Sequence, residues 1–260
     1  MRIVLIGGKG GVASLLVQAW KDEHELVLVD RRPEPVPGTE HVVGEADDPE
    51  VLRRAMHGAD AVVHLAAVLP IGTEEEHLPM TAQAFAVNVG TVLLALRIAR
   101  CEGIASFVHI SSLSVFTRYG REVLPADAVP DATDLYGLSK RVAEQALRIA
   151  VEEPAPTAQE QPIRVTSLRL AFPATAEMWP KWQPFHRPDW TPVLHRTREG
   201  LAVGSLHEED LATAVLTAIS RTAGGPYETV AVSGAPHAYD DGSASRLLGW
   251  VPRHVCDPQA

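Results

Sequence analysis

The sequence contains little cysteine and fewer basic than acidic residues, and each shortage excludes a class of protein. Two cysteines, Cys101 and Cys256, occur in 260 residues. They are too few for a disulfide framework and lack the spacing of metal ligands. Lysine and arginine number 23 against 33 aspartates and glutamates, for a formal net charge of −10. Because binding to phosphate groups needs a basic face, this charge argues against a nucleic-acid partner and an anionic membrane surface.

Long hydrophobic runs are the third shortage. No apolar run approaches the roughly 20 residues needed to cross a bilayer. The chain opens directly into the strand-like run Arg2–Ile6, without the layout of a signal peptide. Hydrophobic residues make up 46% of the sequence and charged residues 22%, as is ordinary for a globular protein. We expect a soluble, cytoplasmic protein with reduced thiols, made of one large α/β domain or two modest ones.

Short β-rich runs alternate with longer helical stretches over the first two thirds of the chain. The expected strands are Arg2–Ile6, Glu25–Asp30, His41–Val43, Ala61–Leu65, Ser106–Ile110 and Arg164–Leu170. The expected helices are Val12–Lys21, Pro49–His57, Thr81–Glu102 and Leu135–Val151. Strands that alternate with helices predict βαβ units and a parallel sheet. Continuous apolar runs such as Ile3–Ile6 are typical of these strands, because both of their faces are covered.

The last third of the chain is less regular. The Pro-rich, polar segment 152–162 is expected to be a surface loop. From about 173 to 198 the sequence is rich in Pro, Trp and His without clear periodicity, and a helix at Glu208–Ser220 and an apolar run at Glu228–Val232 follow. We expect a small C-terminal lobe inserted around the main sheet, not an independent domain.

A glycine-rich segment follows the first expected strand and opens the first helix. Residues Gly7–Ala13 have the pattern G-x-x-G-x-x-A. Small residues there permit a tight turn, close approach of the backbone to a pyrophosphate, and close packing of helix on strand. The helix N-terminus adds free N–H groups and a positive dipole end. The segment therefore predicts a dinucleotide-binding turn.

Asp30 closes the second expected strand, about 20 residues beyond the glycines. An acid at this place can hydrogen-bond the ribose hydroxyls of the adenosine and repels a 2′-phosphate, which favours NAD. Arg31 and Arg32 follow it, and an arginine nearby can accommodate NADP. NAD is the expected cofactor, and NADP stays an alternative.

Tyr136 and Lys140 are four residues apart in an expected helix. Residues at this spacing share a helix face, so we expect the ammonium of Lys140 to lie beneath the phenol. The pKa of a free tyrosine is about 10, and a neighbouring cation lowers it by favouring the phenolate. The pair thus predicts a residue that handles protons.

Seven landmarks occur in an order that resembles the extended short-chain dehydrogenases/reductases, the NAD-dependent epimerase/dehydratase family. They are Gly7–Ala13, Asp30, His64–Ala67, Asn88–Thr91, Ser111–Phe116, Tyr136–Lys140 and Leu248–Pro252. The resemblance covers nearly the whole chain and is weakest from Pro173 to His207. It implies an α/β fold with a Rossmann-type doubly wound parallel sheet. Residues 1–172, with a return at 204–233, would form the NAD-binding domain, and residues 173–260 would form mainly a small substrate-binding lobe.

The resemblance also implies the site residues. Ser112, Tyr136 and Lys140 would be catalytic, with Ser112 stabilising the substrate oxygen and Lys140 lowering the pKa of Tyr136. Together with the turn and the acid above, the expected cofactor-binding residues are Gly7, Gly8, Lys9, Gly10, Gly11, Val12, Asp30, Arg31, Glu45, Ala46, Leu65, Ala66, Ala67, Asn88, Tyr136, Lys140 and Leu170. Substrate contacts are expected at Ser112, Leu113 and Phe172. His64 is expected to be a core histidine, and no metal site is expected.

The chain departs from the family pattern at four places. Gly11 stands where an aromatic residue usually follows the second glycine, and Ala13 replaces the third glycine. Glu45 stands where the family has an adenine-contacting aspartate. Phe116 stands where the family often has tyrosine, so any contact through that hydroxyl is lost.

The sequence indicates the substrate less clearly than the cofactor. Aromatic and basic residues gather between Pro173 and Arg198, and such a set can recognise a sugar that bears a carboxylate or phosphate. A loop pinned by buried tryptophans with solvated cations is the alternative. The short lobe is similar to that of uronate dehydrogenases, but those enzymes have an Asn-His pair where this chain has Leu113-Ser114.

Three functions remain open at this point. The first is an NAD-dependent oxidoreductase on a small, sugar-like hydroxyl or carbonyl substrate. The second is a nucleotide-sugar epimerase or dehydratase that recycles NAD within each turnover. The third is a non-catalytic NAD-binding sensor. A homodimer through the helices Thr81–Glu102 and Leu135–Val151 is expected by analogy alone.

Overall fold

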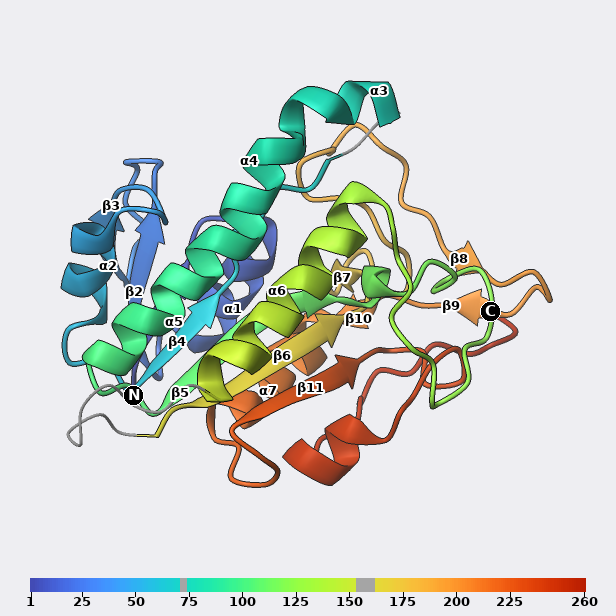
Figure 1. Cartoon of the computed structure of the whole chain (residues 1–260). Helices are drawn as coiled ribbons and strands as arrows, with labels where there is room; N and C mark the ends of the chain where they lie inside the picture. The colour runs from blue at the N-terminus through green and yellow to red at the C-terminus, as the bar shows by residue number, and fades with distance from the viewer. Residues whose placement is uncertain (71–73, 153–161) are drawn as a thin grey trace.

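Seven parallel strands form one sheet at the centre of the computed structural model, which describes residues 1–70, 74–152 and 162–260 (Figure 1). The strand order is β11-β6-β5-β4-β1-β2-β3. The strands are β1 (Arg2–Ile6), β2 (Glu25–Asp30), β3 (Glu40–Val43), β4 (Ala61–His64), β5 (Ser106–Ser112), β6 (Arg164–Leu170) and β11 (Tyr227–Val232). The predicted α/β fold with a Rossmann-type parallel sheet is confirmed.

The apolar runs become strands that are buried on both faces. In β1, Ile3 and Leu5 belong to one core cluster, whereas Val4 and Ile6 belong to the other. Because successive side chains of a strand point to opposite faces, the alternation puts a separate apolar layer on each side of the sheet. This is why the strands read as continuous hydrophobic runs.

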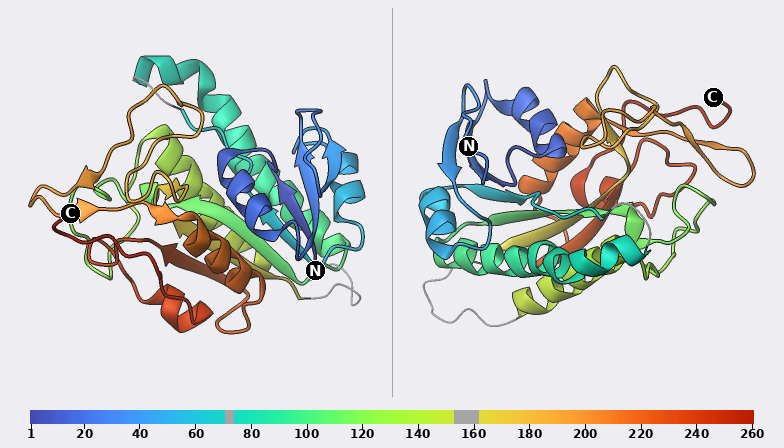
Figure 2. Two further views of the ribbon diagram at one scale, coloured as in Figure 1. Left: turned by 180° about the vertical axis from the view of Figure 1, so that it is seen from behind. Right: turned by 90° about the horizontal axis from the view of Figure 1, so that it is seen from above.

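Helices cover both faces of the sheet (Figure 2). The helices α1 (Gly11–Trp20) and α7 (Glu208–Ile219) supply side chains to one core layer. The helices α2 (Pro49–Met56), α5 (Val92–Cys101) and α6 (Leu135–Glu152) supply them to the other. Asp48 caps α2 by accepting from the N–H groups of Glu50 and Val51, as expected for an acid before a proline-led first turn.

The helix expected at Thr81–Glu102 is less regular than predicted, and its helical segment begins at Leu78 and ends at Cys101. It follows α3 (Glu74–His77) and runs through α4 (Thr81–Phe85) and a π-helical stretch, Ala86–Thr91, into α5. By length and composition Leu78–Cys101 is apolar enough to cross a membrane, with a mean hydropathy of 1.5. The expectation that no such run exists is therefore wrong. Its α5 part packs on the sheet through residues such as Leu96, as a core helix does.

The C-terminal third returns to the sheet after a small lobe. Two short sheets lie in the lobe: β7 (Pro173–Ala174) pairs with β10 (Leu206–His207), and β8 (His195–Arg196) pairs with β9 (Ala202–Val203). Helix α7 and strand β11 then complete the main sheet, with β11 parallel to β6. Most of the surface loop expected at 152–162 lies outside the described residues.

Candidate functional site

The glycine turn between β1 and α1 has the geometry of an anion-binding turn. The N–H groups of Gly7 and Gly8 donate to the carbonyl of Val29 at 2.9 and 3.1 Å. Gly7 has φ +81°, and a Cβ there would lie 2.7 Å from the backbone of Ala66. Only glycine fits this approach. The first turn of α1 starts at Gly11, and its N–H groups have no partners within the helix. They are therefore available to an anion.

Gly11 is needed for a reason that the sequence did not indicate. A Cβ on Gly11 would lie 2.1 Å from Cγ of Phe185, so the ring of this lobe residue covers the start of α1. Phe185 also packs against the same core layer as Val12. The position where the family usually has an aromatic residue is thus occupied by an aromatic ring from elsewhere in the chain. No local signal around Phe185 could have predicted this contact.

Asp30 is held in place at the end of β2 by two neighbours. Its carboxylate accepts from the N–H of Lys9 at 3.0 Å, and from the N–H and guanidinium of Arg32 at 3.0–3.2 Å. Burial opposes ionisation, but the hydrogen bonds from Arg32 and Lys9 hold the pKa of Asp30 below its usual value. An ionised acid therefore stands beside the glycine turn.

Ser112, Tyr136 and Lys140 meet where β5 ends and α6 begins. Ser112 is the last residue of β5, and its hydroxyl accepts from the N–H of Ser114 at 3.0 Å. Lys140 is buried, lies over the ring of Tyr136 at 5.8 Å from its centroid, and donates to the carbonyl of Ile110 at 2.7 Å. The helical spacing thus brings phenol and amine together as expected.

The pKa of the phenol differs from the expectation. Burial raises the pKa of Tyr136 to about 12, a hydrogen bond with Ser112 lowers it, and the charge of Asp134 raises it. Burial also lowers the pKa of Lys140 to about 8, against the charge of Glu144. The predicted lowering of the tyrosine pKa by Lys140 is therefore not seen, because desolvation dominates both groups.

A cleft of about 750 Å³ joins these parts. Many predicted site residues line it: Lys9, Gly10, Gly11, Val12, Leu65, Ala67, Ser112, Tyr136, Lys140, Leu170 and Phe172. Arg32 and Trp182, which the sequence had also suggested, line it as well, together with residues that the sequence did not indicate: Ser14, Leu69, Pro184, Phe185 and His186. The Trp-rich segment was a signal for Trp182, although not for which of its tryptophans faces the cleft.

Other predicted residues lie outside the cleft lining. They are Gly7, Gly8, Asp30, Arg31, Glu45, Ala46, Ala66, Asn88 and Leu113. Leu113 is fully buried in a third apolar cluster, and its expected substrate contact stays a prediction. Arg32 lines the cleft where Arg31 was expected.

Two buried polar residues, Asn88 and His64, hold segments next to the cleft in place. Asn88, in the π-helical stretch, accepts from the N–H of Val68 and donates to the Val68 carbonyl and to Ser139 of α6, at 2.7–2.9 Å. It therefore fixes the loop after β4 against α6. His64 is bonded to Thr91 at 3.0 Å, and burial lowers its pKa to about 3. His64 is a neutral core histidine, as expected.

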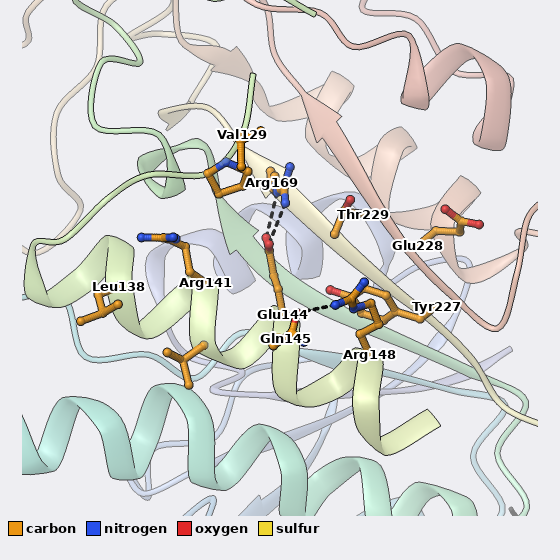
Figure 3. Close-up of a pocket in the computed structure, with 12 residues that line it drawn as sticks. Val129, Leu138, Arg141, Glu144, Gln145, Arg148, Arg169, Tyr227, Glu228 and Thr229 are labelled. Atoms are coloured by element: carbon orange, nitrogen blue, oxygen red, sulfur yellow. Dashed lines mark hydrogen bonds and ion pairs between the residues drawn. The ribbon is translucent and has the colours of Figure 1, made fainter. Parts of the chain in front are cut away.

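A second hollow, of about 680 Å³, lies between α6 and the sheet edge at β11 (Figure 3). Its cations already have partners within the chain. Arg169 forms a two-point pair with Glu144 at 3.0 and 2.8 Å, and Arg148 donates to Gln145 at 2.8 Å. Glu144 also accepts from Ser111 at 2.7 Å. We interpret these paired side chains as a structural network that holds Ser111, the residue next to Ser112, in place.

One group among the described residues has donor atoms close enough for a metal ion, namely His207, Glu209 and His254. The two histidine rings are stacked, with centroids 3.7 Å apart and planes 16° apart. Ring-nitrogen lone pairs lie in the ring plane, so parallel rings do not converge on one ion. His207 instead caps α7 by accepting from the N–H of Glu209 at 3.2 Å. The geometry therefore suits a helix cap better than a metal site.

Comparison with known proteins gives a family and a fold. A profile of the NAD dependent epimerase/dehydratase family matches residues 3–185. A 3 beta-hydroxysteroid dehydrogenase/Delta 5→4-isomerase of Mycobacterium tuberculosis is 31% identical over 153 residues, 55% of this chain and 41% of the relative. The matched part thus spans less than half the length of this relative.

Two solved structures are similar over nearly the whole chain. A mutated uronate dehydrogenase matches with a TM-score of 0.72 and 18% identity, over 98% of this chain and 82% of the other. A UDP-glucuronic acid 4-epimerase from Bacillus cereus, in complex with NAD, matches with a TM-score of 0.70 and 18% identity, over 97% and 94%. At these identities the likeness is one of fold.

Proposed function

The chain belongs to the NAD-dependent epimerase/dehydratase family of enzymes, and we propose that it is an oxidoreductase that interconverts a secondary alcohol and its ketone with NAD. The observation that supports this proposal most is that one cleft contains both the N-terminal turn of α1 and the set Ser112, Tyr136 and Lys140. A dinucleotide bound at this turn would lie next to the residues to which we assign proton transfer.

The residues present fit a dinucleotide. The close approach at Gly7, where a Cβ would meet the backbone of Ala66, leaves a flat turn for a pyrophosphate. We assign the pyrophosphate to the N–H groups at the start of α1 and the adenosine ribose to Asp30. The ionised acid favours NAD over NADP, because it would repel a 2′-phosphate. Arg32 lines the cleft but is paired with Asp30, which supports the same choice.

Proton transfer is the part of the reaction that this chain's own residues supply. Oxidation of an alcohol to a ketone releases a hydride, which NAD takes up, and a proton. We assign the exchange of this proton to Tyr136 and the stabilisation of the substrate oxygen to Ser112. With a pKa raised to about 12, Tyr136 is protonated at neutral pH in this structure, which suits donation to a ketone oxygen. Lys140 supplies positive charge beneath the ring.

Substitution of Tyr136 by Phe tests the proposal. The change removes one hydroxyl and keeps the ring, so Tyr136→Phe should leave the NADH dissociation constant within about twofold. Turnover should fall by roughly 10²–10⁴-fold, the usual share of general acid–base catalysis. Fluorescence titration with NADH and steady-state rates at 340 nm measure the two effects. Full turnover in the variant would refute the assignment of Tyr136.

An epimerase that recycles NAD is the second candidate, favoured by the likeness to the UDP-glucuronic acid 4-epimerase fold. The two functions differ in net redox change. NADH that accumulates with an alcohol supports the oxidoreductase, whereas product without net NADH supports the epimerase. NADH binding with neither outcome would instead favour a sensor.

A further inference from the structure

The side of the cleft formed by the C-terminal lobe is apolar and aromatic. Its lining residues from the lobe and the segments next to it are Leu69, Phe172, Pro173, Trp182, Pro184, Phe185 and His186. None of these side chains carries a permanent charge. A ligand that reaches Ser112 and Tyr136 from this side therefore contacts mainly carbon.

Phe172 and Trp182 in this wall contact each other, and Phe172 also contacts two rings outside the lining. Phe172 stacks on His195 at 4.3 Å between centroids and packs against Trp182 at 5.3 Å and Tyr119 at 5.6 Å. Such pairs add to the stability of the apolar contacts that they make. The wall is thus a preformed surface.

The wall stands close to the proposed reaction centre. Leu170 at the end of β6 pairs in register with Ser112 at the end of β5, and Phe172 follows two residues later. Phe172 has φ +21°, a conformation that non-glycine residues rarely adopt and that costs free energy. The surrounding contacts hold it there, at the carboxyl edge of the sheet where ligands bind in this class of fold.

The arginines of the lobe contact groups that do not line the cleft. Arg187 lies over the ring of Trp190 at 4.6 Å, Arg196 donates to the carbonyl of Gly200 at 3.0 Å, and Arg198 pairs with Glu122. None of them lines the cleft, and neither does Lys181. The segments 71–73 and 153–161, which the structure does not describe, contain no lysine or arginine. The wall therefore has no source of a fixed positive charge.

The cations that do line the cleft are already engaged on its cofactor side. Lys9 donates to the carbonyls of Arg32 and Glu34, Arg32 pairs with Asp30 at 3.0 Å, and Lys140 donates to Ile110. A carboxylate or phosphate placed against the aromatic wall would lose its hydration without gaining an ion pair. Burial of an unpaired charge in this way is unfavourable.

We propose, resting on the proposed oxidoreductase function, that the substrate is an uncharged alcohol or ketone whose apolar ring face packs on Phe172 and Trp182. Sugars that bear a carboxylate or a phosphate are excluded by the same wall. The sequence-based idea of an anionic sugar depended on the cations between 181 and 198, and the structure places these cations elsewhere.

A matched pair of cyclohexanols tests the proposal with the full-length protein and NAD. The apolar probe is 4-cyclohexylcyclohexanol, and the anionic probe is 4-hydroxycyclohexanecarboxylate, which presents the same ring alcohol. We expect kcat/KM for NADH formation to favour the apolar probe by about 100-fold, since pocket contacts of this kind give factors of 10–200. Glucuronate and UDP-glucuronate serve as further anionic probes.

Trp182→Arg is the variant that tests the wall itself. It introduces a cation among the aromatic residues, so the preference for the apolar probe should fall by at least about tenfold, while the NADH dissociation constant stays within about twofold. Trp190→Arg is the matched control, because Trp190 is 41% exposed and does not line the cleft. It should leave the preference unchanged. If Trp182→Arg does not fold, Trp182→Leu should keep the preference and raise KM for the apolar probe.

The outcomes separate this inference from the function on which it rests. A protein that binds NADH but oxidises an anionic probe at least as well as the apolar one refutes the inference and leaves the oxidoreductase function standing. A protein that does not bind NADH refutes the function. If no probe is turned over, binding of 4-cyclohexylcyclohexanone, followed by quenching of tryptophan fluorescence, decides: failure to bind refutes the inference.

Discussion

At the scale of single residues, spacing predicted the meeting of Tyr136 and Lys140 but not their protonation. The i, i+4 rule places the two side chains together, and the structure puts the ammonium 5.8 Å from the ring centroid. The pKa values depend on burial, which comes from β5, α6 and the loops packed over them. A sequence pattern predicts which side chains lie together more readily than how far each side chain is removed from water.

Lys140→Met should stabilise the cofactor-free protein at neutral pH. Burial lowers the pKa of Lys140 from 10.5 to about 8, so holding it charged costs folding free energy on the order of 3 kcal/mol. Relief of this cost should raise Tm at pH 7 by roughly 6–12 °C in a chain of this size, as measured by calorimetry. Turnover should be lost.

The lowered pKa of Lys140 determines how the stability difference between the wild type and Lys140→Met changes with pH. Between pH 8 and 10.5 the unfolded chain binds more protons at this lysine than the folded one, so wild-type stability rises with pH across this window. The advantage of Lys140→Met should therefore shrink as pH rises and vanish above 10.5. The exposed Lys181 provides the control, and Lys181→Met should show no such trend. A constant difference at all pH values would contradict the explanation.

At the scale of elements, sequence patterns predicted the helices and strands better than the contacts between distant segments. The glycine turn was predicted from its place between β1 and α1, because its chemistry is local. The cover that Phe185 forms over Gly11 was not, because it depends on how the lobe folds back. The hydrogen bonds of Gln183, which donates to the carbonyls of Arg187 and Trp190 at 2.9 and 2.7 Å, help to shape the loop that holds this ring.

Gly11→Ala should weaken NADH binding, and Phe185→Ala should reverse much of the effect. A Cβ at position 11 would lie 2.1 Å from the Phe185 ring, so the ring must move and disturb the start of α1. We expect the NADH dissociation constant to rise about tenfold in Gly11→Ala, with a loss of 1–3 kcal/mol in stability. In the double variant the loss should be smaller than the sum of the single losses, as contacting residues show.

Gly90 offers a matched control for that experiment. A Cβ there would meet nothing within 4 Å, so Gly90→Ala should leave both NADH affinity and Tm close to wild type. Fluorescence titration and thermal unfolding of the wild type, the two single variants at positions 11 and 185 and their double variant complete the double-mutant cycle. Strict additivity of the two changes at positions 11 and 185 would show that the contact does not couple them.

At the scale of the whole molecule, the parallel sheet was predictable because strands that are buried on both faces have continuous apolar sequences. The lobe was not, because residues 173–207 have only short strands and many turns whose shape depends on the aromatic cluster around Phe172. The proposed division at residue 172 also depends on the return of α7 and β11. This return joins the two parts into one core, in which Leu211 and Val230 pack with Leu5 and Leu168.

A chain that ends at residue 172 should therefore fail to fold into a stable NAD-binding domain. It lacks β11, which pairs with β6 over six residues, and α7, which covers one face of the sheet. The apolar side chains of β5 and β6 on that face would be exposed to water, at about 25 cal/mol for each Å². Circular dichroism, thermal unfolding and NADH titration of the fragment and the full chain measure the outcome. A fragment that unfolds cooperatively and binds NADH would contradict this view.

The contact between Phe185 and Gly11 also has a consequence for the protein as it is made. The ring that covers the glycine turn follows it by about 170 residues in the sequence, a delay of roughly 10–30 s at ordinary rates of translation. During that interval the nascent chain exposes a phosphate-binding turn without its cover and without the last strand of the sheet. The cover over the glycine turn therefore forms only after the lobe has been synthesised.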